Sequence, residues 1–282
     1  MIDELHQQDH LPVTLLCQTL GVSRSAWYAW QQDELGQRRR EDNQLIPLIR
    51  KIFWAHKRRF GARRIVKELA KRKQPCSRER AARLMDKMGL KAIRPRSFRP
   101  QTTNSQHQLG YSPNLLLDAP PPTGIDQLWV GDITYIPLKE GGFLYLAVVM
   151  DRYSRRIVGW DLQDHMRESL VTEALRKAIR SRRPQSGMIH HSDRGGQYAG
   201  TTYRGILGRS RMLQSMSRAA NCYDNAFMES CFGTIKRELE MEVYENSEIA
   251  RKEVLGFIRY YNTRRLHSAL DYLTPIAFEA AL

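Results

Sequence analysis

The sequence predicts an α/β protein in which a mixed five-stranded sheet, flanked by helices, follows an all-helical N-terminal region. Two observations predict this order. Between residues 12 and 89, apolar residues recur at helical spacing and are separated by Gly, Pro and Ser. From residue 128 onwards, short β-rich runs and helical stretches follow one another in a β-β-β-α-β-α-β order.

The positive charge of the chain is concentrated in its first third. The formal net charge is +15, and residues 1–100 hold 23 lysines and arginines against 10 acidic residues. Residues 101–282 hold 22 against 20. A basic module joined to a near-neutral domain favours a polyanionic partner, most commonly nucleic acid.

Other features exclude several classes of protein. No apolar run approaches the roughly 18–20 residues of a membrane span, and the N-terminus lacks the apolar core of a signal peptide. We therefore expect a cytoplasmic protein with no membrane partner. The four cysteines form no C-x-x-C pair, which argues against structural zinc and against a disulfide framework.

Residues 1–40 are expected to form a first helix-turn-helix module. Apolar residues from Val13 to Leu20 recur at helical spacing, Gly21 breaks the run, and Ser23 can cap a second helix over residues 24–31. A helix, a glycine turn and a capped helix are typical of a DNA-binding module, with Arg24 as a contact candidate. A plain helical hairpin is the alternative.

Residues 41–95 are expected to form a second such module. After a charged spacer at residues 38–42, a helix is predicted over residues 45–56, and another follows Phe60. Pro75 stops that helix, Ser77 caps a helix over residues 78–88, and Gly89 ends it. Solvated surface arginines are the alternative to DNA contacts here, but the density of basic residues favours DNA. The contact candidates are Arg63, Arg64, Arg78, Arg80 and Arg83.

Residues 96–122 are predicted to be a basic, proline-rich linker, and residues 123–240 the sheet domain. The first three strands, joined by tight turns, predict an antiparallel meander. The expected strands are 129–136, 143–150, 154–160, 188–191 and 212–216, with helices over 169–181 and 202–207 between them.

Three carboxylates stand out in this domain. Asp132 lies within the first strand, Asp193 follows the fourth, and Glu229 lies on an expected helix over residues 221–239, in which Asn225 and Lys236 share its stripe. Three close carboxylates persist when a divalent cation holds them, and oxygen ligands favour Mg²⁺ or Mn²⁺. The alternatives are a simple turn at Asp193 and three unrelated surface acids, because spacing alone cannot show that the three converge.

These residues resemble a known family. Asp132 within Trp-Val-Gly-Asp-Ile-Thr-Tyr, Asp193 within His-Ser-Asp-Arg-Gly-x-Gln-Tyr, and Glu229, with 35 residues between it and Asp193, resemble the DDE triad of retroviral-integrase-like transposases. Lys236, seven residues after the glutamate, also fits. The run from Tyr261 to Pro275 (Tyr-Asn-x-x-Arg-x-His, then Thr-Pro) is similar to the tail of bacterial insertion-sequence transposases encoded in two overlapping frames. The chain resembles their second-frame, catalytic product.

The resemblance implies a ribonuclease-H-like core that uses two Mg²⁺ ions, with Mn²⁺ as a substitute. Asp132, Asp193 and Glu229 would be the catalytic metal ligands. A metal-activated water would cleave a strand at the end of the element, and the freed 3′-hydroxyl would attack a phosphodiester without a covalent protein intermediate. Residues 241–282 would form a helical extension of the core.

The resemblance also implies roles for the surrounding residues. Lys236 would contact DNA near the active site. Asp151 would have a turn role, and the three histidines His190, His191 and His267 would be structural or DNA-contacting rather than catalytic. Candidates for DNA contact or for support of the ligands are Arg194, Gln197, Asn225 and Arg265.

The expected partners are double-stranded DNA, both the terminal inverted repeats of the element and the target, and further copies of the chain, at least as a dimer. The upstream-frame protein, separate or fused, is another expected partner, and the protein would be associated with the nucleoid. Two alternative functions stay open at this point. One is a DNA-binding regulator with a dead core, and the other is a structure-specific nuclease that does not join DNA.

Overall fold

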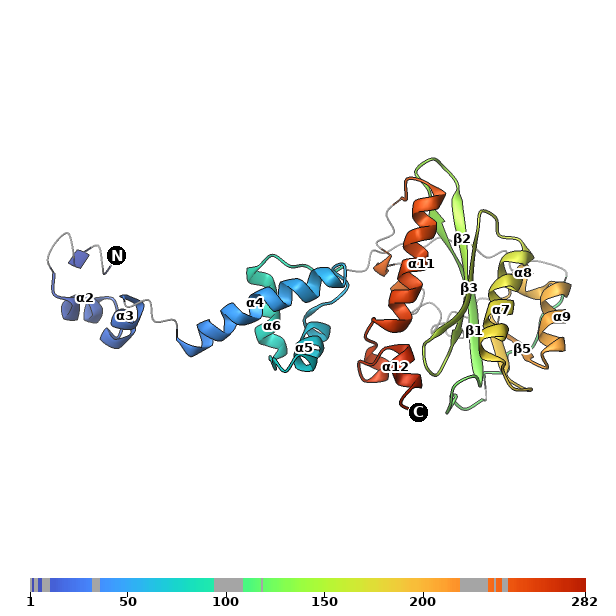
Figure 1. Cartoon of the computed structure of the whole chain (residues 1–282), viewed down its shortest axis with the longest axis horizontal. Coiled ribbons are helices and arrows are strands. Elements are labelled where there is room, and N and C mark those ends of the chain that lie inside the picture. The colour runs from blue at the N-terminus through green and yellow to red at the C-terminus, as the bar shows by residue number, and fades with distance from the viewer. Residues whose placement is uncertain are drawn as a thin grey trace. The chain divides into compact units, whose positions relative to one another are not determined.

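The structure is a computed structural model of the 282-residue chain, which divides into two compact units, Met1–Ala92 and Ile93–Leu282 (Figure 1). No described helix is long and apolar enough to cross a membrane. The residues described are 2, 5–6, 11–31, 36–93, 109–117, 119–218, 233–235, 237–239 and 243–282.

The first unit begins with a short helical pair, α2 (Val13–Thr19) and α3 (Arg24–Gln31). Gly21, at a φ of +65°, makes the turn between them, where a side chain would be strained. The Ser23 hydroxyl accepts a hydrogen bond from the Ala26 amide at 3.2 Å and caps α3, as the sequence predicts. Leu16, Cys17 and Trp27 are buried.

Three further helices follow in the described part of this unit: α4 (Gln37–Ala55), α5 (Ala62–Lys71) and α6 (Arg78–Lys87). The Ser77 hydroxyl caps α6 by accepting from the Arg80 amide. The expectation that residues 38–42 form a spacer was wrong, because α4 already begins at Gln37. The physical reason lies in tertiary contacts of this stretch with α6, which are described below, and which spacing along the chain does not reveal.

The second unit contains a five-stranded sheet in the order β3-β2-β1-β4-β5. β1 (Leu128–Pro137), β2 (Phe143–Asp151) and β3 (Ile157–Gln163) are antiparallel neighbours. β4 (Ile189–Ser192) and β5 (Leu213–Met216) extend the sheet in parallel from β1. This confirms the predicted meander and the mixed, ribonuclease-H-like sheet.

Helices cover both faces of the sheet. Figure 1 shows α7 (Glu168–Arg182), α8 (Gly196–Ala199) and α9 (Thr201–Arg209) on one side. On the other side lie α11 (Ser247–Thr263) and α12 (Pro275–Glu279), with the short 3₁₀ helix η2 (Ser268–Leu270) between them in the chain. The short α8 was not expected from the sequence. On the α7 side, a core cluster that includes Trp129, Leu175 and Tyr203 fixes these helices to the sheet.

Part of the expected linker packs against the second unit. The Leu115 amide donates to the Ser215 hydroxyl of β5 at 2.9 Å, and Ser112 donates to Gln214 at 2.8 Å. Arg204 of α9 donates to the Gly110 carbonyl at 2.8 Å. Residues 109–117 therefore lie along β5 and help cover a strand at the edge of the sheet.

Candidate active site

The register of β1 and β4 brings two of the predicted carboxylates together. The parallel pairs are Leu128 with Ile189 and Val130 with His191. Continuing this register by two residues places Asp132 opposite Asp193, the residue that directly follows β4. Because paired strands lie about 4.8 Å apart, the two carboxylates arise from neighbouring positions.

Both aspartates line one small pocket. The other residues around it come from β1, from β2, from the loop before α7 and from α8, and they include Tyr145, Met166 and Tyr198. The Asp193 carboxylate also accepts from the Gly195 amide at 2.9 Å, and the Asp132 carboxylate accepts from the Ile133 amide at 2.8 Å. Asp193 thus makes the turn that was the alternative to a functional role, and it lines the pocket as well.

Tyr198 lies beside these two carboxylates and is only 3% exposed. Burial, followed by the negative charge of Asp132, raises the pKa of its hydroxyl well above the usual range, and Asp193 adds to the effect. Tyr198 was not predicted from the sequence. The signal that could have found it is its place one turn after Asp193, on a helix that starts at the Gly195-Gly196 pair.

A buried histidine lies close to the strand that carries Asp132. His190 is fully buried on β4, and its Nε2 lies 3.1 Å from the Tyr203 hydroxyl. Burial, and then the proximity of His191, lower the pKa of His190 to about 3, so the ring is neutral at physiological pH. A Cβ added at Gly131 would lie 3.0 Å from this ring, so the strand next to Asp132 requires a glycine for close packing.

His191 and Asp151, two other residues singled out in the sequence, make hydrogen bonds that stabilise the fold. His191 is held between two hydroxyls, with Nδ1 2.8 Å from Ser215 and Nε2 3.1 Å from Ser217. Asp151 is fully buried and accepts from the amides of Asp126, Tyr153 and Ser154, which is a turn role. Burial raises its pKa, and the hydrogen bonds from Ser154 and Asp126 oppose that rise.

The third carboxylate, Glu229, lies outside the described residues, as do Asn225 and Lys236. Across the part of the chain that the structure describes, no group of three or more His, Cys, Asp or Glu residues could hold a metal ion. The described residues therefore bring together two of the three predicted ligands, Asp132 and Asp193, which line one pocket. The role of Glu229 stays a prediction.

Arg265 has a buried carboxylate partner that the sequence did not reveal. The residue is 5% exposed and donates twice to Glu238, from Nε at 2.8 Å and from Nη2 at 2.7 Å. These bonds tie Arg265 to the fold of the second unit, and its roles in DNA contact or in support of the ligands stay predictions. His267 is also buried and lies 3.1 Å from Arg265.

Arg194 and Gln197 surround the pocket with contacts to backbone. Arg194 donates from Nε to the Ser217 carbonyl at 2.7 Å, and its guanidinium lies over the ring of Tyr111. Gln197 donates to the Met166 carbonyl at 3.0 Å. Both residues therefore support the loops around Asp193, whereas their contact with DNA stays a prediction.

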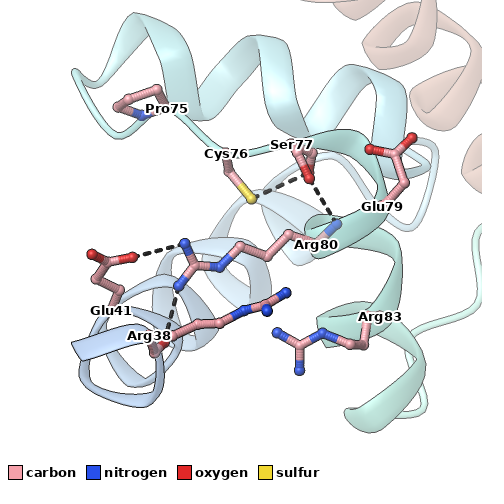
Figure 2. A pocket seen from close by; sticks show the side chains of 8 residues that line it. All are labelled: Arg38, Glu41, Pro75, Cys76, Ser77, Glu79, Arg80 and Arg83. Atoms are coloured by element: carbon pink, nitrogen blue, oxygen red, sulfur yellow. Dashed lines mark hydrogen bonds and ion pairs between the residues drawn. The ribbon is translucent and has the colours of Figure 1, made fainter. Parts of the chain in front are cut away.

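Arg80 in the first unit has carboxylate partners that the sequence did not reveal. Its side chain is 18% exposed and donates to Glu41 at 2.8 Å and to the Arg38 carbonyl at 3.0 Å (Figure 2). It also donates to Asp42 at 2.7 Å. These bonds join the start of α4 to α6, which explains why residues 38–42 are helical. Arg80 therefore holds two helices together, and its contact with DNA stays a prediction.

The other predicted arginines of this unit lie on its surface. Arg83 donates to Asp42 at 2.6 Å and is about half exposed, and its hydrogen bond is the largest influence that lowers the pKa of Asp42. Arg64 donates to the Arg59 carbonyl at 3.2 Å. Arg24, Arg63 and Arg78 are exposed.

Comparison with known proteins agrees with these observations. Residues 40–98 match the HTH-like domain family, and residues 122–222 and 210–275 match two integrase core domain families. The IS600 uncharacterized 31 kDa protein of Shigella sonnei is 42% identical over 93% of this chain and 97% of its own length. Transposase InsF for insertion sequence IS3A of Escherichia coli (strain K12) is 36% identical over 98% and 96%.

Among solved structures, the chain is similar to the HTLV-2 integrase catalytic core domain in complex with magnesium (trimeric form), at 14% identity and a TM-score of 0.44, covering 55% of this chain and 96% of that one. The relatives above match this chain from near one end to the other, in both the helical region and the core. The chain therefore belongs to the IS3 family of insertion-sequence DDE transposases, which are polynucleotidyl transferases.

Proposed function

We propose that the chain cleaves DNA strands at the ends of an insertion sequence and joins the freed 3′-hydroxyl to a target strand, with Asp132, Asp193 and Glu229 as the ligands of a metal centre. The observation that carries this proposal is the β1–β4 register, which places Asp132 beside Asp193 in one pocket. Two unrelated surface acids would have no reason to share adjacent strand positions.

The donor set fits Mg²⁺ or Mn²⁺. Both described donors are carboxylates, and their negative charge adds to burial, the larger cause, in raising the pKa of the neighbouring Tyr198 hydroxyl. Carboxylate oxygens suit hard divalent cations. When bound, two such ions would stabilise the attacking and leaving oxygens of an in-line phosphoryl displacement.

The protein's own residues supply the shape of this site. Asp132 lies in the sheet, the Gly195 amide donates to the Asp193 carboxylate, and Tyr198 lines the pocket with both aspartates. The neutral His190 ring lies close to Gly131, next to Asp132. Because burial lowers the pKa of His190 to about 3 and the ring has no exposed surface, His190 is too weak a base and too inaccessible to serve as a general base. The preorganised carboxylates and their fixed hydrogen-bond partners match a mechanism that depends on positioning.

The first unit supplies DNA binding in this proposal. Its exposed cations Arg63 and Arg78 lie on α5 and α6, within the residues that match the HTH-like family. The module built from α2 and α3 contributes less, because residues 11–31 carry one charged side chain, Arg24. We assign terminal-repeat binding to residues 41–95, catalysis to residues 123–240, and a helical extension to residues 241–282. We further propose that the chain acts as an oligomer, since two DNA ends must be joined, and together with the upstream-frame protein.

A labelled DNA end incubated with the protein and Mg²⁺ tests the proposal. Ends that still carry flanking DNA should yield both cleaved and joined products, and pre-cleaved ends whose terminal nucleotide lacks the 3′-hydroxyl should yield no joined product. Glu229→Gln should abolish cleavage and joining while DNA binding survives. Glu248→Gln, at an exposed glutamate of α11, is the matched control and should leave both reactions intact. Full cleavage by Glu229→Gln would remove Glu229 from the mechanism, and cleavage by the wild type without joining would indicate a nuclease.

A further inference from the structure

Tyr198 is a buried tyrosine whose ring ends beside the strand that carries Asp132. The residue is 3% exposed and lines the pocket that Asp132 and Asp193 share. A Cβ built on Gly131, the residue before Asp132, would lie 3.6 Å from Cε1 of the Tyr198 ring. Because Cε1 is bonded to the carbon that bears the hydroxyl, the polar end of this side chain lies next to the part of β1 that contains Asp132.

The position of Tyr198 is fixed by contacts of its backbone and its ring. Its amide donates to the Gly195 carbonyl at 3.0 Å, and the Gly195 amide in turn donates to the Asp193 carboxylate. The Tyr198 carbonyl accepts from the Gln214 side chain on β5 at 2.7 Å. The ring packs edge-on against Tyr203, with the two ring centres 5.3 Å apart. The hydroxyl is therefore held in one place relative to Asp193 and to the sheet.

The charges of both aspartates act on the Tyr198 hydroxyl. Burial is the largest of the causes that raise the pKa of this hydroxyl well above its ordinary value, and the charge of Asp132 comes next. Tyr203 and the charge of Asp193 add to the effect. The hydroxyl therefore keeps its proton at physiological pH, and a protonated tyrosine can donate a hydrogen bond to a carboxylate.

The neighbouring Tyr203 uses its hydroxyl differently. It is also fully buried, and its hydroxyl lies 3.1 Å from Nε2 of His190. Among the residues that the structure describes, the hydroxyl of Tyr198 has no such hydrogen-bond partner. Phenylalanine would fill the same space without the cost of taking a polar group out of water. Packing alone therefore does not account for a tyrosine at this position, and the pocket is where its hydroxyl can be used.

The pocket suits a hydroxyl that supports a metal ligand. Its cavity volume is about 20 Å³, which is room for about one water molecule. Side chains that bind a metal ion usually have a further hydrogen-bond partner, which orients them and tunes the affinity for the ion. A lysine or arginine in this position would repel the cation, and a further carboxylate would repel the ligands. A neutral donor such as the Tyr198 hydroxyl avoids both effects.

We propose that Tyr198 is a positioning residue of the metal site: its hydroxyl donates a hydrogen bond to the Asp132 carboxylate and so fixes the oxygen that Asp132 presents to a divalent cation. Asp193 accepts from the Gly195 amide in its own loop, and Tyr198 gives Asp132 a donor from outside its own strand. This inference rests on the proposed function, in which both aspartates bind the cation. It does not depend on the position of Glu229.

The test compares removal of two neighbouring hydroxyls in the full chain. Tyr198→Phe removes the hydroxyl and keeps the ring. Tyr203→Phe is the matched control, because its hydroxyl belongs to the same aromatic pair but is bonded to His190. Replacement of Tyr198 by 4-aminophenylalanine restores a neutral donor at the same place, and Asp132→Asn removes a proposed ligand. The measurements are Mn²⁺ affinity from the EPR signal of free Mn²⁺, thermal unfolding without metal, and the Mg²⁺ concentration for half-maximal cleavage.

The two phenylalanine variants should show opposite patterns. Tyr198→Phe should weaken Mn²⁺ binding by about 10-fold, as loss of a hydrogen bond to a metal-binding side chain does, and should raise the Mg²⁺ concentration needed for cleavage. It should not lower the unfolding temperature. Tyr203→Phe should lower the unfolding temperature, because His190 loses a hydrogen-bond partner, and should bind Mn²⁺ like the wild type. The 4-aminophenylalanine variant should regain most of the Mn²⁺ affinity.

Wild-type Mn²⁺ affinity in Tyr198→Phe, together with weaker binding in Asp132→Asn, would overturn the inference. Equal weakening in both phenylalanine variants would also overturn it, because aromatic packing would then determine the affinity. Should Tyr198→Phe fail to fold, the 4-aminophenylalanine variant decides: near wild-type Mn²⁺ affinity supports the inference, and weak binding contradicts it. Failure of the proposed function looks different, because Asp132→Asn would then bind Mn²⁺ no more weakly than the wild type.

Discussion

The buried, neutral His190 makes the stability of the second unit depend on pH. Its pKa is about 3 in the folded chain because burial penalises the charged ring, whereas an imidazole in the unfolded chain titrates near its ordinary value of 6.5. The folded-state pKa is depressed, so the unfolded state binds the proton more tightly. Stability from this residue is fully present above pH 6.5, falls as the pH drops below that value, and stops falling below about pH 3.

The magnitude follows from these two pKa values. At pH 5 the unfolded imidazole is almost fully protonated while the folded one is not, and the unfolded state gains about 2 kcal/mol relative to pH 8. That is a large part of the roughly 5–15 kcal/mol by which a domain is stable. Protonation of His190 would also act close to the candidate active site, because the imidazole ring lies close to Gly131, the residue before Asp132.

The measurement is urea unfolding between pH 8 and pH 5, read by pulsed hydrogen exchange of peptides from β1 and β4 so that the second unit alone is followed. His190→Gln, which cannot take up a proton, should be less stable at pH 8 but should lose about 2 kcal/mol less than wild type on acidification. Carboxylates and other histidines contribute equally in both proteins. The same loss in both would refute the assignment of a neutral, buried His190.

Two further predictions concern packing and DNA contact. Gly131→Ala should destabilise the second unit by about 1–3 kcal/mol, because the added carbon would meet the His190 ring at 3.0 Å, and it should also reduce cleavage. Thermal unfolding and a cleavage assay measure the two effects. A stable, fully active variant would contradict the close packing of Gly131 on His190. In the first unit, Arg78→Ala should lower the slope of DNA affinity against salt concentration by about 0.9, whereas Arg80→Ala should leave the slope unchanged and lower the unfolding temperature of this unit. Titration of DNA binding with salt measures the slope, and calorimetry measures the unfolding temperature. Arg80 is expected to act through its bonds to Asp42 and Glu41, so a slope lowered equally by both variants would instead indicate that Arg80 contacts DNA.

The sequence predicted the sheet domain closely because its signals are local. β-rich runs broken by Gly141-Gly142 located β1 and β2 to within a residue or two, and Ser23 and Ser77 marked the starts of two helices. Each of these features depends on neighbouring residues only. Hydrophobic periodicity and helix-capping residues were therefore sufficient to predict most of the fold.

The failures share a different cause. The helical start of α4 depends on Arg80, which is about 40 positions away in the chain, and the buried state of Arg265 depends on Glu238, 27 positions away. Both arginines looked like surface cations because a basic chain presents many of them. No rule of spacing distinguishes an arginine that meets DNA from one that meets a distant carboxylate, so only the three-dimensional contacts could assign these two.

The three proposed metal ligands also differ in how much of their placement the strand pattern can predict. Asp132 lies within β1 and Asp193 directly follows β4, and both line one pocket. Their neighbourhood follows from the register of the two strands, in which a shift by one residue would turn a whole strand over. Glu229 lies outside the described residues. Its part in the site therefore rests on the resemblance of its sequence position to the DDE pattern, and it stays a prediction, whereas the neighbourhood of the two aspartates can be read from the strands that carry them.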